Sequence, residues 1–156
     1  MRCEKCMTET NKGGNYSFYY GTFTGSSRFD RHITFQHFRI GGSENVFLCD
    51  DCVNRQINRF ALLVGSVFSL IALAFSVLRL FVGGPAPEGS SLETIIGFPI
   101  ALVGGPLLYL GISRSWKRGK NREIMGDSLA IQLRKNNLKS KGYTKFFTRE
   151  NYKGLY

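Results

Sequence analysis

The chain has 156 residues, of which 43% are hydrophobic, and it carries a formal net charge of +10 at pH 7. These averages fit an ordinary soluble domain, but the apolar residues are concentrated in two long runs, which argues against one. The sequence contains no His-Glu-x-x-His, Gly-x-Ser-x-Gly or phosphate-binding glycine loop. We therefore expect neither an enzyme nor a small-molecule substrate.

The composition changes sharply along the chain, and we predict a mixed α+β membrane protein in three parts. Residues 1–59 form a small β-rich, cysteine-bearing head in the cytoplasm. Residues 60–112 form two transmembrane helices, at about 60–82 and 94–112, joined by a short outside loop at 83–93. Residues 113–156 form a basic cytoplasmic tail with short helices.

The head is predicted to contain strands between its cysteines. Residues 15–24 (NYSFYYGTFT) and 31–40 (RHITFQHFRI) are dense in aromatic and β-branched side chains, and Gly25-Ser26-Ser27 between them is a turn signal. A short third strand, at 45–48, follows. Because a head of this size buries little core, a metal ion is an expected stabiliser.

All four cysteines occur in two Cys-x-x-Cys pairs, Cys3/Cys6 and Cys49/Cys52. A tight turn lets two thiols at this spacing bind one tetrahedral ion, and two pairs complete a four-thiolate shell. We predict one structural Zn²⁺, with four-cysteine iron left open because its ligands are the same. Disulfides need an oxidising compartment, and a thioredoxin-like redox pair needs a βαβ pattern that is missing from this sequence.

The order of these features resembles treble-clef and zinc-ribbon domains. A knuckle at Cys3-Glu4-Lys5-Cys6 precedes the strands, and Cys49-Asp50-Asp51-Cys52 precedes a helix-compatible stretch at 53–60. The resemblance covers residues 1–59 and implies a structural zinc bound by the four cysteines. It implies no activity, because such domains serve protein, nucleic-acid and scaffolding roles. The helix-compatible stretch favours the treble clef over the zinc ribbon.

The two apolar runs, 61–78 and 94–112, contain no charged side chain. A bilayer core requires roughly 20 apolar residues in a helix, so both runs are candidates to span a membrane. Each run also has small residues at every fourth position, which lets helix backbones approach closely within one hairpin or between molecules. These residues are Ala61, Gly65 and Ser69 in the first run and Gly97, Ala101 and Gly105 in the second.

The positive charges predict the orientation of the hairpin. Residues 1–59 contain eight Lys and Arg and residues 114–156 contain twelve, whereas residues 83–93 contain none. The positive-inside rule then places both termini in the cytoplasm. The cations next to the runs are expected to contact the anionic inner leaflet. They are Arg55, Arg59, Arg114, Lys117, Arg118, Lys120 and Arg122.

The first run begins close to the second cysteine pair. If Cys52 and Phe60 share one helix, their eight-residue separation spans ~12 Å. The metal would then lie just off the lipid headgroups.

The tail carries signals for two helices. Asp127 is a predicted N-cap for a helix through Leu138, and Gly142 is a predicted C-cap. Thr148 is a predicted N-cap for a short helix at 149–155. With so few apolar groups, this tail is expected to pack on the head, on the inner leaflet or on a partner.

These features favour a membrane-anchored zinc-binding interaction or scaffold module, or a small subunit of a membrane complex. Its partner would be another protein or a second copy of the chain. The alternative is a membrane-tethered nucleic-acid-binding domain, in which aromatic rings stack on bases beside cations. The residues concerned are Tyr16, Phe18, Tyr19, Tyr20, Phe23, Phe35, Phe38, Arg28, Arg31 and Arg39.

Overall fold

The computed structural model describes residues 1–30, 33–82 and 91–153, with most of their side chains. It is a mixed α+β structure that divides into two compact units. One unit combines Met1–Asn54 with Gly119–Tyr156, and the other is Arg55–Arg118. The C-terminal segment therefore folds together with the N-terminal segment, the first of the three locations expected for the tail.

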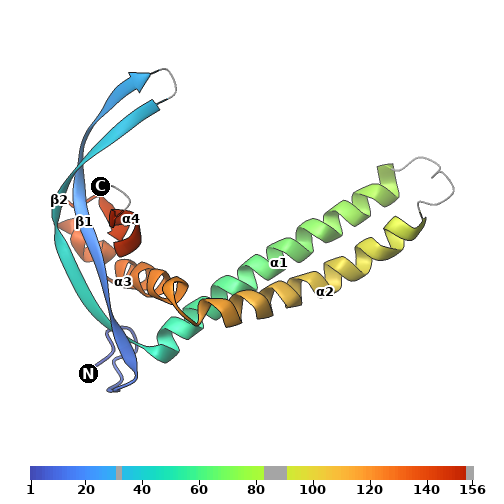
Figure 1. Ribbon diagram of the computed structural model, residues 1–156, viewed down its shortest axis with the longest axis horizontal. Coiled ribbons are helices and arrows are strands. Elements are labelled where there is room, and N and C mark those ends of the chain that lie inside the picture. Colours follow the sequence, from blue (N-terminus) through green and yellow to red (C-terminus); the bar gives the residue numbers. More distant parts are fainter. Residues whose placement is uncertain (31–32, 83–90, 154–156) are drawn as a thin grey trace. The chain divides into compact units, whose positions relative to one another are not determined.

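The first unit is built on an antiparallel sheet (Figure 1). Strand β1 (Gly13–Asp30) pairs along its length with β2 (Ile33–Cys49). A short strand, β3 (Lys145–Thr148), pairs with Phe18–Gly21 on the other edge of β1, giving the order β2-β1-β3. The sequence indicated the hairpin, but β3 was not predicted.

The predicted turn at Gly25-Ser26-Ser27 is wrong, because β1 continues through it to Asp30. The pairing register shifts between Phe23 and Gly25, and Gly25 has φ 155°. The glycine therefore accommodates a bulge in a continuous strand instead of reversing the chain. The predicted third strand at 45–48 is likewise the last part of β2.

Alternate residues of the hairpin form a buried face, as the strand period predicts. Tyr16 and Phe18 of β1 are buried, whereas Tyr20 is half-buried beside Phe18. Helix α3 (Lys120–Ser140) packs against the strands and contributes further core residues. The buried residues that β2 and α3 supply are Val46, Leu48, Met125, Leu129, Ala130 and Leu138.

The first tail helix differs at its start from the prediction. Helix α3 begins at Lys120, so Asp127 lies inside it and does not cap it. Gly119, with φ 67°, is the residue directly before the helix. At the other end the C-cap is Lys141, one residue before the predicted Gly142. Gly142 follows it with φ 91° and donates its N–H to the carbonyl of Lys139 at 3.0 Å, so the glycine helps to end the helix.

The last helix, α4 (Arg149–Lys153), has the predicted cap. The backbone N–H of Asn151 donates to the hydroxyl of Thr148 at 3.3 Å. The final residues of the predicted stretch, 154–156, lie outside the described residues.

Helices α1 (Asp50–Val82) and α2 (Ser91–Trp116) carry the two apolar runs. Among the described residues, one helical stretch, Asp50–Leu78, is long and apolar enough to cross a membrane. Its leucine and phenylalanine side chains are largely exposed; Leu70, for example, is 67% exposed. A core helix of a soluble domain would bury such residues. The first part of the second predicted span has no described side chains.

The second unit brings α1 and α2 into close contact. A Cβ atom added to Gly65 would lie 2.8 Å from the carbonyl oxygen of Gly105, and one added to Gly105 would clash with Ser69. Phe60 of α1 stacks on Trp116, the last residue of α2, with their ring centroids 4.9 Å apart.

Three other small residues were predicted to lie at helix contacts. Ala61 is fully buried. The predicted contact residues Gly97 and Ala101 lie outside the described side chains.

Candidate metal centre

The sheet register brings the two cysteine pairs together. Cys3 and Cys6 lie in the loop before β1, Cys49 is the last residue of β2, and Cys52 is in the first turn of α1. Gly13 at the start of β1 pairs with Cys49, so the preceding loop folds back beside the end of β2. The backbone N–H of Glu4 donates to the carbonyl of Phe47 at 3.1 Å and fixes the loop there.

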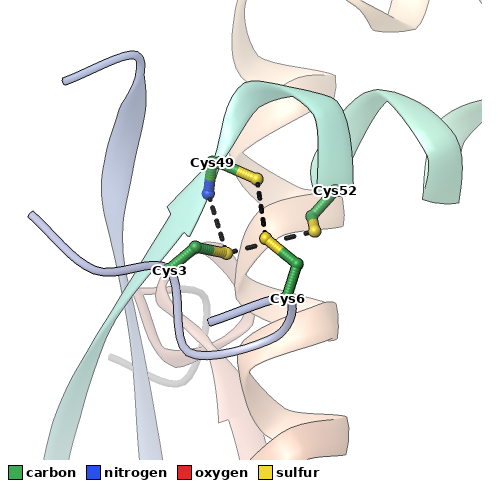
Figure 2. Close-up of side chains that lie close together, drawn as sticks. All are labelled: Cys3, Cys6, Cys49 and Cys52. Carbon is green, nitrogen blue, oxygen red and sulfur yellow. Dashed lines mark hydrogen bonds between the residues drawn. The ribbon is translucent and has the colours of Figure 1, made fainter. Parts of the chain in front are cut away.

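The four thiols converge on one point, as Figure 2 shows. All four Sγ atoms lie within 4.8 Å of one another. The Sγ atoms of Cys6 and Cys49 are 3.6 Å apart, and those of Cys3 and Cys52 are 4.0 Å apart. A tetrahedral zinc ion with Zn–S bonds of ~2.3 Å separates its sulfurs by ~3.8 Å. The four cysteines therefore fit a single metal ion.

Hydrogen bonds favour the thiolate form of the first pair. Burial opposes ionisation of Cys3, but backbone N–H groups, including that of Cys49 at 3.2 Å, lower the pKa of its thiol. Hydrogen bonding by Thr8 lowers the pKa of the exposed Cys6 to about 6. Burial instead raises the pKa of Cys49. Because metals bind thiolates, these N–H donors support metal binding at Cys3 and Cys6.

Two ion pairs that were not predicted from the sequence join the cysteine loops, defined as residues 3–6 and 49–52, to α3. The carboxylate of Glu4, between Cys3 and Cys6, lies 2.5 Å from the guanidinium of Arg134. The carboxylate of Asp50, next to Cys49, lies 2.5 Å from the guanidinium of Arg122. Because more than 70 residues separate the partners of each pair, no local pattern connects them.

The cations predicted to contact the inner leaflet fall into two groups. Lys120 and Arg122 belong to the first unit and form ion pairs with Glu150 and Asp50, respectively. The others belong to the second unit; all are exposed except Lys117, which is half-buried. These are Arg55, Arg59, Arg114, Lys117 and Arg118.

The aromatic residues considered for base stacking differ in burial and in their contacts. Tyr16 and Phe18 are buried in the head, where they pack against other apolar groups. Tyr19 stacks on Tyr152 of α4, with ring centroids 3.9 Å apart. Phe23 remains 42% exposed, and the side chain of Phe35 lies outside the described ones.

Comparisons of the chain with protein-family models, curated proteins and solved structures found no match.

Proposed function

We propose that the chain is a membrane-anchored interaction module whose cytoplasmic head is stabilised by one structural zinc ion. The observation that carries this proposal is the convergence of four thiols at tetrahedral ligand distances. Four thiolates fill the coordination sphere of zinc and leave no open position for a substrate or a reactive water. The ion would therefore hold the head together.

The arrangement of the ligands supports a treble-clef type of zinc domain. The first pair lies in a loop before the hairpin, Cys49 ends β2, and Cys52 lies in the first turn of α1. In a zinc ribbon, the second pair would instead lie on another loop between strands. The first turn of α1 also contains Asp50 and Asp51, whose negative charge is favourable at a helix N-terminus.

Membrane anchoring is supported by α1 and by the charges around the hairpin. The helix that contains Cys52 also contains the apolar stretch long enough to cross a bilayer. We propose that α2 is the second span and that both termini are cytoplasmic, because the Lys and Arg residues flank the hairpin and the connection at 83–93 has none. A reducing cytoplasm would keep the cysteines available for metal.

The test is to extract the full-length chain from membranes in a mild detergent and to quantify zinc and iron per chain. We expect about one zinc ion per chain, and loss of that ion in Cys3→Ser/Cys49→Ser. Lys5→Gln is a matched control, because Lys5 lies inside the first cysteine loop but supplies no thiol. A bound iron instead of zinc would show absorption in the visible range.

The interaction role is tested on the same preparations by comparing co-purifying proteins. We expect the native partners to be lost from the metal-free Cys3→Ser/Cys49→Ser variant and retained by Lys5→Gln. Retention of the same partners by the metal-free variant would contradict a role of the zinc-stabilised head in binding. Salt-dependent binding of labelled single-stranded RNA by the purified chain would favour the nucleic-acid alternative.

A further inference from the structure

The two ion pairs between the cysteine loops and α3 have a consequence for metal binding. In each cysteine pair the carboxylate that directly follows the first cysteine, Glu4 or Asp50, pairs with an arginine of α3. The two arginines, Arg122 and Arg134, are 12 residues apart in α3, which corresponds to ~18 Å of helix. The cysteine cluster is therefore attached to α3 at two separated points.

Further contacts connect the first cysteine loop to α3. Cys3 is fully buried, and the side chains of Leu133 and Arg134 lie with Cys3 and Glu4 around one cavity of about 280 Å³. Arg134 also lies 3.7 Å from Glu44 of β2, so a single guanidinium joins the cysteine loop, the sheet and α3. A change in the conformation of this loop therefore moves a contact of α3.

We infer that metal occupancy of the four-cysteine site and docking of α3 on the sheet are thermodynamically coupled through Glu4–Arg134 and Asp50–Arg122. This inference rests on the proposed metal site and describes how docking of α3 would regulate metal binding there. Without the metal the four sulfur atoms no longer join the two cysteine loops, and backbone contacts such as that from Glu4 N–H to the carbonyl of Phe47 remain between them. The carboxylates are then held less firmly opposite the arginines, so loss of metal weakens the docking of α3 on the sheet and alters the surface offered to a partner.

Coupling of this kind is reciprocal: if the metal favours docked α3, docked α3 favours bound metal by the same factor. Each pair is partly exposed, with 40% and 34% exposed side chains at Arg134 and Glu4. Pairs of this exposure contribute modestly, so removing one is expected to change metal retention about two- to fivefold.

The experiment uses the full-length chain in detergent micelles, loaded with one equivalent of Zn²⁺. Transfer of zinc to an excess of a chromogenic chelator is followed by absorbance. We expect Arg134→Gln and Arg122→Gln to accelerate zinc transfer about two- to fivefold. Lys120→Gln is the matched control, since it removes an equal charge from the same helix and breaks the Lys120–Glu150 pair, which contacts neither cysteine loop.

A double-mutant cycle assigns the effect to the pair. If Glu4 and Arg134 act through one contact, Glu4→Gln/Arg134→Gln releases zinc no faster than Arg134→Gln alone. Equal rates for Arg134→Gln, Lys120→Gln and the unmodified chain would overturn the coupling while leaving the zinc site in place. Failure of the unmodified chain to bind zinc would overturn both the proposed function and the coupling.

A second measurement needs no variant. Amide hydrogen exchange is compared between zinc-loaded and chelator-treated unmodified chain. We expect faster exchange throughout α3 after metal removal, with unchanged exchange in the part of α2 from Leu102 to Trp116. Unchanged protection of α3 without metal would show that its docking is independent of the site.

Discussion

The carboxylate of Asp127, in the middle of α3, accepts a hydrogen bond of 3.1 Å from the backbone N–H of Ser17 in β1. Its other oxygen accepts a hydrogen bond of 3.2 Å from the backbone N–H of Arg149, the first residue of α4. Asp127 is only 3% exposed. One buried side chain thus joins β1, α3 and α4. Asp127 accepts a hydrogen bond from the first N–H of α4, as a capping residue would, but it does not cap α3, the helix that contains it.

Asp127→Ala is expected to destabilise the head by about 1–3 kcal/mol, because it leaves two backbone N–H groups without an acceptor in a buried setting. The measurement is thermal unfolding of the full-length chain, followed by the near-ultraviolet circular dichroism of its tyrosines. Glu150→Ala is the control, since that carboxylate is 44% exposed. Equal melting temperatures for the two variants would contradict a structural role for Asp127.

The stability of the head is expected to depend on pH through the same residue. Burial raises the pKa of Asp127 above its usual range, although the hydrogen bond and charge of Arg149 oppose the shift. The folded head therefore binds the carboxyl proton of Asp127 more tightly than the unfolded chain does. The contribution of this protonation to stability is greatest at low pH and is lost as the pH rises through the folded-state pKa of Asp127.

Asp127→Asn tests this pH dependence because it cannot titrate. The unfolding free energy of the unmodified chain relative to Asp127→Asn should decrease as the pH is raised from about 4 toward neutrality. Denaturant unfolding at several pH values measures the difference. A difference that increases with pH would show that the pKa of Asp127 is lowered in the folded head.

Gly126→Ala is expected to destabilise the packing of α3 on β1 by about 1–3 kcal/mol. A Cβ atom at Gly126 would overlap the ring of the buried Tyr16, so the ring or the helix would have to shift. Replacing Tyr16 with leucine in the same chain should recover part of the loss. If Gly126→Ala proves as stable as the unmodified chain by thermal unfolding, the close contact is absent in solution.

The hairpin allows a matched pair of glycine substitutions. Gly105→Ala would place a Cβ atom 2.8 Å from the carbonyl oxygen of Gly65, whereas a Cβ atom at Gly111 meets nothing within 4 Å. We expect Gly105→Ala to separate the helices and cost about 1–3 kcal/mol, and Gly111→Ala to be tolerated. The emission of Trp116, which stacks on Phe60, monitors thermal unfolding of the hairpin in micelles. Similar transitions for both variants would exclude tight packing at Gly105.

Removal of metal is expected to expose all four thiols to a thiol reagent, whereas one equivalent of zinc should protect them. The helical circular dichroism of α1 and α2 should persist in micelles, because those helices form their hydrogen bonds internally. Thiol titration before and after addition of zinc measures the protection. Four freely reactive thiols in the presence of zinc would contradict the four-thiolate site.

Local sequence signals predicted much of the head. Cys-x-x-Cys spacing identified the four thiols that converge, because each pair needs only one turn to face the same way. Thr148 and Gly142 predicted helix ends that depend on nearby backbone groups. The turn within each cysteine pair and the end of each helix are determined within a few residues along the chain.

What the sequence did not reveal depends on contacts between distant segments. Asp127 looked like an N-cap because aspartate is common there, yet its partners are Ser17 and the start of α4. The Gly25 turn signal was overridden by pairing with β2, and Phe146–Phe147 joined the sheet only because β1 had an open edge. Ion pairs such as Glu4–Arg134 likewise have no sequence signature.

The composition of the first unit has a consequence for the order of folding during synthesis. Its sheet and cysteine cluster come from residues 1–54, but the helix that completes its core comes from residues after 119. A ribosome makes the whole α1–α2 hairpin in between. The head can therefore close only after the whole hairpin has been synthesised, and a chain that stalls at the hairpin leaves Tyr16, Phe18 and Leu48 without the helix that covers them.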